Sequence, residues 1–203
     1  MFALVQNEAA AATQDSCKAL AMSGGANNGA WEAGVLWGFV NHGNPEDFAY
    51  DVVTGVSVGS LNAFLVSVYP KGQEKEMVQF MSDTWLNLLN SDVWANWTLS
   101  PVAGLITQKG FLDNRPLLNF LKNISAGWDQ FYRKITVSAL DIETGKVKAF
   151  NQDNTSIDEF YKAAFSSTCI PGVFPPYEWT IDGHDYMFSD NFIIGNDNPY
   201  SAI

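Results

Sequence analysis

Short apolar runs alternate with longer amphipathic stretches along the first half of the chain. The runs at residues 19–22 and 51–54 are short and lead directly into glycine-containing turns, so each predicts a buried strand. Residues 30–43, 58–69 and 75–89 carry apolar side chains at helical spacing, and a glycine or proline ends the first two. Strands that alternate with helices are typical of an α/β domain with a mostly parallel sheet.

The second half of the chain has the alternating pattern of antiparallel hairpins. One predicted hairpin turns at Thr144 and Gly145, and another turns at Asp182 and Gly183. Their strands are expected at residues 134–142, 146–150, 177–181 and 184–188. These hairpins add antiparallel strands near one side of the sheet.

Polar signals define two further helices in this half. Asn114 and Pro116 predict a helix that continues through residue 121. Ser156 and Glu159 have the spacing of a capping box at the start of another helix. Residues 91–112 have weak periodicity, and we expect them to form a long surface excursion.

The two ends of the sequence differ from this pattern. Residues 1–16 begin with a short apolar stretch that lacks a basic region, so we expect a flexible segment that fits the remnant of a signal peptide. Residues 17–203 are expected to form a single domain. Because few residues follow Asp190, there is little room for a closing helix, and we expect the domain to be truncated at its C-terminus.

Composition excludes several classes of function. The 203 residues carry a net charge of −11, which argues against binding to nucleic acid or to strongly anionic membranes. No apolar run approaches the roughly 18–20 residues of a membrane-spanning helix, so we expect a soluble chain. The N-x-[ST] sequons at Asn96, Asn123 and Asn154 favour a secreted or vacuolar location over a cytoplasmic one.

The chain offers few ligands for a metal. Its two cysteines, Cys17 and Cys169, are too few for a four-cysteine zinc site, and they could form one disulfide or remain buried thiols. The carboxylates are scattered, and the two histidines, His42 and His184, do not form a pair at ligand spacing. We therefore expect neither a metal nor another cofactor.

The stretch VVTGVSVGSLNAF contains the strongest candidate for a catalytic residue. Ser57 is the centre of a G-x-S-x-G motif between a predicted strand and a predicted helix, which is the context of a nucleophile elbow. A second glycine-rich turn, MSGGANNG, joins the first strand to the first helix. That turn lacks the lysine of a phosphate loop and the middle glycine of a dinucleotide fingerprint, and it suits an oxyanion.

Four blocks in order resemble the patatin-like phospholipase family: LAMSGGANNGAWEAGVL, DVVTGVSVGSLNA, AFSSTCIPGVFPP and YMFSDNFIIGNDNP. The resemblance runs from about residue 20 to residue 199. It implies a three-layer α/β/α sandwich with a central mostly parallel sheet, and hydrolysis of lipid or phospholipid acyl esters. It also implies a serine–aspartate dyad, with Ser57 as nucleophile, Asp190 as base, and an oxyanion hole at Gly24, Gly25 and Ala26.

The sequence departs from the family pattern in the first glycine-rich turn and after the aspartate. Ala26 replaces a glycine, Asn28 replaces a basic residue, and Asn191 and Phe192 follow the aspartate where the family has small residues. These departures motivate a rival hypothesis, a catalytically weak or inactive lipid-binding or storage protein. In either case the expected partner is a lipid, met at a membrane or micelle interface.

A third hypothesis is a Ser–His–Asp esterase that uses His184, with Asp141 or Asp158 as the acid. It is weakened by the position of His184 beside a predicted turn. Asp182 matches the family's Asp-Gly signature superficially, but its alternating flanks predict a hairpin turn. Ser166 and Ser167 are alternative nucleophiles without an elbow context, and their segment is expected to form the wall of a substrate channel.

Overall fold

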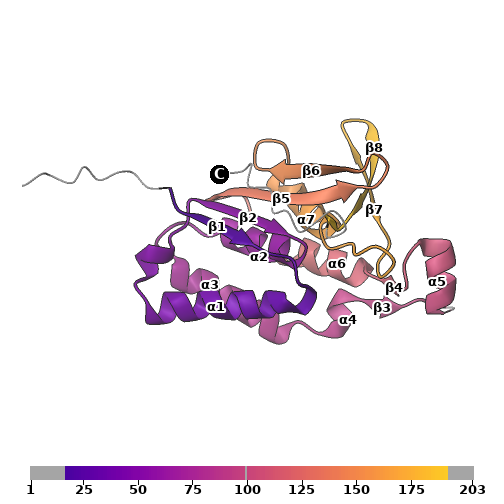
Figure 1. The fold of residues 1–203 in the computed structure, drawn as a ribbon. Coiled ribbons are helices and arrows are strands. Elements are labelled where there is room, and N and C mark those ends of the chain that lie inside the picture. The colour runs from indigo at the N-terminus through magenta and orange to yellow at the C-terminus, as the bar shows by residue number, and fades with distance from the viewer. Residues whose placement is uncertain (1–16, 99, 192–203) are drawn as a thin grey trace, which may run out of the picture.

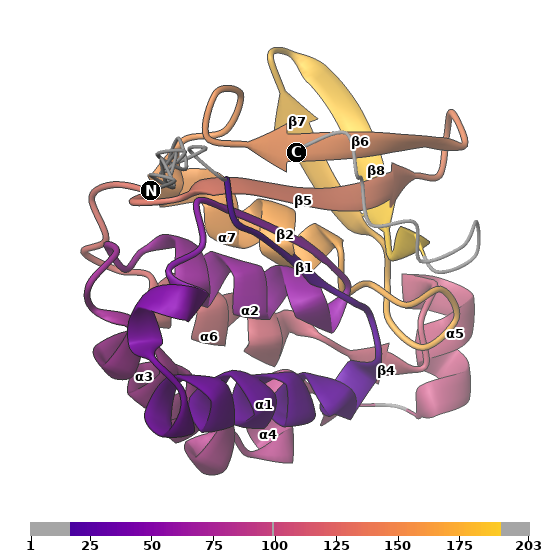
Figure 2. The same cartoon turned by 60° about the vertical axis from the view of Figure 1, so that its left-hand side comes forward.

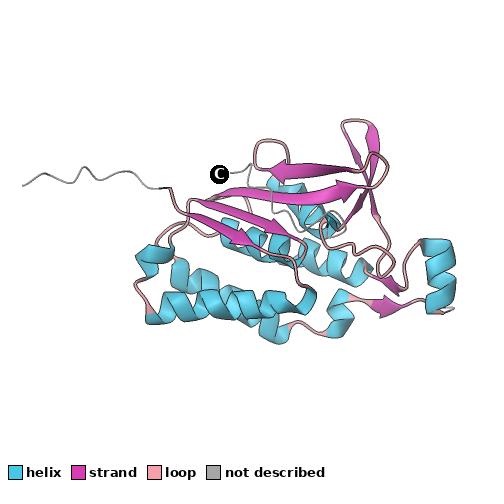
Figure 3. Cartoon of the chain, viewed as in Figure 1, coloured by secondary structure: helices cyan, strands magenta, loops and turns pink. Residues whose placement is uncertain are grey.

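The structure, a computed structural model, describes residues 17–98 and 100–191 as a sheet flanked by helices (Figures 1 and 3). The strands are β1 (Ala19–Met22), β2 (Val52–Val56), β3 (Ala95–Asn96), β4 (Leu112–Asp113), β5 (Lys134–Asp141), β6 (Lys146–Asn151), β7 (Tyr177–Ile181) and β8 (His184–Ser189). The α-helices are α1 (Gly29–His42), α2 (Val58–Ser67), α3 (Glu74–Asn87), α4 (Asn90–Val93), α5 (Pro101–Gln108), α6 (Arg115–Ile124) and α7 (Ile157–Ser166). Two short 3₁₀ helices are η1 (Ala26–Asn28) and η2 (Pro45–Phe48). The predicted leader at 1–16, the predicted C-terminal truncation and Phe192 lie outside the described residues.

The main sheet combines parallel and antiparallel strands in the order β1-β2-β5-β8-β7, with β6 paired to β5. β1, β2 and β5 are mutually parallel, whereas β6, β7 and β8 join as antiparallel members. The α/β class predicted from the sequence is confirmed, and so are both hairpins. The turn between β7 and β8 has positive φ at Asp182 (52°) and Gly183 (77°), as a tight two-residue hairpin requires.

The core forms where helices cover the parallel strands. Every residue of β2 and of α2 is buried, which explains why that part of the sequence has no charged residue. α1 packs against α3, and α2 lies between this pair and the strands. Figures 1 and 2 both show α1, α2 and α3 on the same side of β1 and β2.

Three local predictions are met only in part or fail. The region expected as a surface excursion does lie at the surface, with only Gly104 and Gly110 buried among its described residues, but it also contains α4, β3, α5 and β4. Local contacts order it: Ser100 Oγ caps α5 by accepting the N–H of Ala103 at 3.0 Å. The capping box at α7 does not form, and the Glu159 carboxylate binds Lys162 instead. The two cysteines form no disulfide, and only Cys169 is buried.

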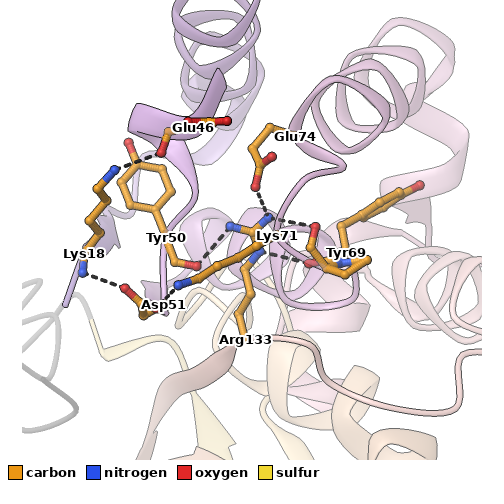
Figure 4. Close-up of polar contacts among 9 residues, drawn as sticks. Lys18, Glu46, Tyr50, Asp51, Tyr69, Lys71, Glu74 and Arg133 are labelled. Carbon is orange, nitrogen blue, oxygen red and sulfur yellow. Dashed lines mark hydrogen bonds and ion pairs between the residues drawn. The ribbon is translucent and has the colours of Figure 1, made fainter. Parts of the chain in front are cut away.

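A buried arginine, Arg133, connects several chain segments where β2 and β5 begin (Figure 4). The glycine-rich turns are at the other ends of the strands. Arg133, directly before β5, forms an ion pair with Glu74 at 3.0 Å, and both side chains are almost completely buried. Its guanidinium also donates to the carbonyl oxygens of Tyr69 (2.9 Å), Tyr50 (3.0 Å) and Pro70 (3.4 Å). One side chain therefore ties together the starts of β2, β5 and α3.

Candidate functional site

Ser57 occupies the turn between a strand and a helix that the sequence predicts. Ser57 stands between β2 and α2 with φ 54° and ψ −131°, a region that costs a residue with a side chain about 1–3 kcal/mol. Hydrogen bonds hold this conformation. The Ser57 carbonyl accepts from the Ser60 N–H (2.9 Å) and hydroxyl (2.5 Å), and the Ser57 N–H donates to Ser167 Oγ at 2.7 Å.

The glycines of the motif are required by close approaches between backbones. A Cβ at Gly55 would collide with the carbonyl of Gly59, so strand and helix can meet this closely only without that atom. A Cβ at Gly59 would lie 2.5 Å from the carbonyl oxygen of Met22 and 2.6 Å from that of Ser23. The first turn of α2 therefore packs directly on the chain that enters the glycine-rich turn, which brings this turn beside Ser57.

We expect Gly59→Ala to lower both the free energy of unfolding and the catalytic rate, since the new methyl group must push Met22 and Ser23 away from α2. Overpacking of this kind costs about 1–3 kcal/mol. Urea unfolding and acyl-ester hydrolysis measure the two effects. The matched control is Gly34→Ala in α1, where a Cβ meets no atom within 4 Å. It is expected to raise stability by about 0.5–1 kcal/mol, and equal effects of both variants would contradict the close packing.

The glycine-rich turn contains backbone donors that have no partner in the described chain. No residue of the described chain accepts a hydrogen bond from the N–H of Gly24 or Gly25. Ala26 has φ 51°, a left-handed conformation that explains why glycine suits the position and that costs alanine about 1–2 kcal/mol. The Ser23 N–H donates to the Glu32 carboxylate at 3.0 Å and so anchors the start of the turn on α1.

Strand pairing brings the chain segments that carry Ser57 and Asp190 together. β6 occupies one edge of β5, so β2 and β8 must both pair with the other edge. β2 ends opposite Ser138, and the antiparallel β8 ends opposite Leu140, which leaves one β5 residue between them. Ser57 and Asp190 therefore follow two strand ends that face each other along one edge.

The segment after α7 lies between these two residues. Ser167 accepts the N–H of Ser57, and the carbonyl of Cys169 accepts the N–H of Asp190 at 2.9 Å. Burial, and to a smaller extent the charge of Asp190, raise the pKa of the Cys169 thiol, which therefore stays protonated. Ser57 and Asp190 are only 5% and 1% exposed, so a reaction here takes place away from bulk water.

A cavity of about 560 Å³ opens beside Ser57. Its walls are mostly apolar and come from the glycine-rich turn, α1, α2, α3, α4, β4, α6 and the segment after α7. Thr168, Ile170, Val173 and Phe174 line it, so this segment is a cavity wall, as its sequence predicted. The cavity has a size suited to a small organic ligand or one acyl chain.

The candidate residues for a Ser–His–Asp triad lie elsewhere in the structure. His184 is exposed at the start of β8, opposite Ile181, whereas Asp190 follows the other end of that strand. Asp141 binds the N–H of Glu143 and the hydroxyl of Thr144, where it stabilises the β5–β6 turn.

The remaining serine, aspartate and histidine candidates have local roles or stay at the surface. Asp158 and His42 are exposed, and Asp182 is in a hairpin turn. The Ser166 hydroxyl donates to the Lys162 carbonyl inside α7 at 2.7 Å.

A polar network beneath the site was missed by sequence reasoning. Asn62 in α2 donates to Glu32 at 3.0 Å and to the carbonyl of Gly29, while its own oxygen accepts the Trp85 indole N–H at 2.8 Å. Burial raises the pKa of the Glu32 carboxyl, although the hydrogen bonds from Asn62 and Ser23 partly oppose this. The amide of Asn62 in a helix without charged residues was the available signal.

Two features are absent from the described part of the chain. Among residues 17–98 and 100–191, no group of three or more histidine, cysteine, aspartate or glutamate side chains could hold a metal ion. No helix in this part of the chain is both long enough and apolar enough to cross a bilayer.

Comparison with known proteins identifies the family. VipD from Legionella pneumophila aligns with a TM-score of 0.49 and 11% sequence identity over 90% of this chain and 46% of VipD, so the chain spans about half the length of that protein. The search of curated proteins gave no match. A family model described as patatin-like phospholipase matches residues 20–195, a range that includes the glycine-rich turn, the elbow and Asp190. The chain therefore belongs to the patatin-like phospholipase family.

Proposed function

We propose that this protein is a serine hydrolase that cleaves acyl esters of lipids or phospholipids, with Ser57 as nucleophile and Asp190 as its base. The observation that carries the proposal is the position of Ser57, which combines a strained elbow conformation with a place in the wall of an apolar cavity. A serine hydroxyl needs an adjacent base to become nucleophilic. The facing ends of β2 and β8 supply a carboxylate-bearing segment next to it.

The first half of the reaction forms an acyl-enzyme. Ser57 Oγ attacks the ester carbonyl carbon while Asp190 accepts the hydroxyl proton, and the carbonyl electron pair moves to its oxygen. Backbone N–H groups of Gly24, Gly25 and Ala26 stabilise this oxyanion, and one such donor is typically worth about 3–4 kcal/mol. The tetrahedral intermediate then collapses, and the departing alcohol oxygen takes the proton from Asp190.

The second half releases the fatty acid. Asp190 accepts a proton from water as the water oxygen attacks the acyl carbon, and the same N–H groups stabilise the second oxyanion. Its collapse breaks the bond to Ser57 Oγ, which recovers its proton from Asp190. The backbone donors do not depend on the residue at position 28, so we expect the chemistry to tolerate Asn28 in place of the family's basic residue.

The test is hydrolysis of a medium-chain chromogenic ester by the parent protein, Ser57→Ala and Ser166→Ala. Ser166 is a matched control, because it is also a buried serine but its hydroxyl bonds inside α7. We expect the parent and Ser166→Ala to turn over and Ser57→Ala to lose activity. Mass spectrometry of the quenched reaction is expected to find the acyl group on the Ser57 peptide.

A folded parent that neither hydrolyses the ester nor becomes acylated would overturn the proposal. In that case retained binding of a fluorescent lipid would favour the lipid-binding or storage alternative.

A further inference from the structure

Helix α5 exposes apolar side chains to solvent. Val102, Leu105 and Ile106 are 61%, 37% and 77% exposed, and their i, i+3, i+4 spacing puts them on one face of the helix. The other side is fixed to the protein, because Gly104 is buried against the ring of Trp97. Figure 1 shows α5 standing at one end of the molecule.

This face is connected to the rim of the cavity. Phe111, 42% exposed, follows α5, and its N–H donates to the Gly172 carbonyl at 3.0 Å. The next residue, Leu112, donates to the Val173 carbonyl at 2.9 Å. Leu112 and Val173 both line the cavity, and Val173 is itself 38% exposed. The segment that follows α5 is thus paired with the segment that lines the cavity.

The segment that contains α5 and the segment that lines the cavity differ in charge from the chain as a whole. Residues 94–112 contain no aspartate or glutamate and only one basic residue, Lys109, although the chain has a net charge of −11. The rim segment 166–177 contains no charged residue. Acidic side chains, which would oppose approach to phosphate head groups, are therefore missing from both segments.

We propose that Val102, Leu105, Ile106 and Phe111 form a docking face for the surface of a zwitterionic phospholipid bilayer. Insertion of these side chains among the head groups places the cavity mouth against the lipid, so an acyl chain enters without crossing water. Large apolar patches on a protein surface commonly mark such contacts. The physiological meaning of this contact rests on the proposed function, but binding itself requires no turnover.

The test measures binding to phosphatidylcholine vesicles by co-sedimentation, with every variant made in a Ser57→Ala background so that hydrolysis cannot alter the vesicles. We expect Ile106→Asp and Val102→Asp each to lower the partition coefficient by about ten-fold or more, since each removes an inserted apolar side chain. The matched control is Tyr132→Asp, 45% exposed near the start of β5, away from the cavity. It is expected to bind like the background protein, and thermal unfolding checks that all variants are folded.

The outcomes separate this inference from the catalytic proposal. Vesicle binding that depends on Ile106 and Val102 supports the docking face even if the parent hydrolyses no ester. Vesicle binding that is absent, or equal in all variants, overturns the docking face even if the parent is an active hydrolase. A concentration-dependent dimer that Ile106→Asp dissociates, without vesicle binding, would show instead that a second copy of the chain covers the face.

Discussion

Asp190→Asn is expected to reduce acyl-ester hydrolysis by about 10²–10⁴-fold, the usual contribution of a positioned general base. Asparagine has nearly the same shape as aspartate but cannot accept the Ser57 proton. Asp190 is 1% exposed, and its N–H is held by the Cys169 carbonyl, so the backbone is expected to keep its position in the variant. Steady-state rates of the parent and variant on the same ester measure the loss.

The double variant Ser57→Ala/Asp190→Asn makes this experiment sharper. Residues that act as one unit have strongly non-additive effects, so we expect the double variant to be no slower than Ser57→Ala alone. If the two losses multiply, Asp190 acts independently of Ser57 and is not its base.

His184→Ala is the matched control for the rival triad. We expect this variant to keep the parent's rate, because His184 is exposed at the other end of β8. Loss of turnover in His184→Ala together with full activity in Asp190→Asn would establish the Ser–His–Asp alternative.

Arg133→Met is expected to lower the free energy of unfolding by about 3–5 kcal/mol, the cost of breaking a buried ion pair from one side. Methionine fills part of the volume but leaves the Glu74 carboxylate buried without its cation. The carbonyls of Tyr50, Tyr69 and Pro70 lose donors as well (Figure 4). Urea unfolding followed by circular dichroism measures the change.

Lys71→Ala is the matched control for this prediction. Lys71 also forms an ion pair, with Asp51, but its side chain is 48% exposed, so we expect a change within about 1 kcal/mol. We further expect Arg133→Met/Glu74→Leu to recover part of the loss, since it removes the unpaired charge. A loss below about 1 kcal/mol for Arg133→Met would mean that water compensates the buried groups.

Local patterns explain why much of the fold could be predicted from the sequence. A tight turn between two alternating segments specifies a hairpin, and both hairpins are present as expected. The strand-to-helix turn at Ser57 was predicted because its glycines and its flanking apolar runs are adjacent in the chain. Prediction failed where the same residue had another partner, as at Glu159, which pairs with Lys162 and does not cap α7.

The features of the candidate site can be separated in the same way, into those set by neighbouring residues and those set by distant parts of the chain. The sequence by itself determined the order of the elements, the strand-to-helix turn at Ser57 and the glycine-rich turn, because each depends on residues within a few positions of one another. Only the tertiary structure decided that Ser167, 110 residues away, accepts the N–H of Ser57, and that β8 meets β2 along one edge of β5. The apolar face of α5 is also a tertiary result, since the sequence pattern of an exposed helix face and a buried one is the same. Which side faces solvent depends on what the rest of the chain covers.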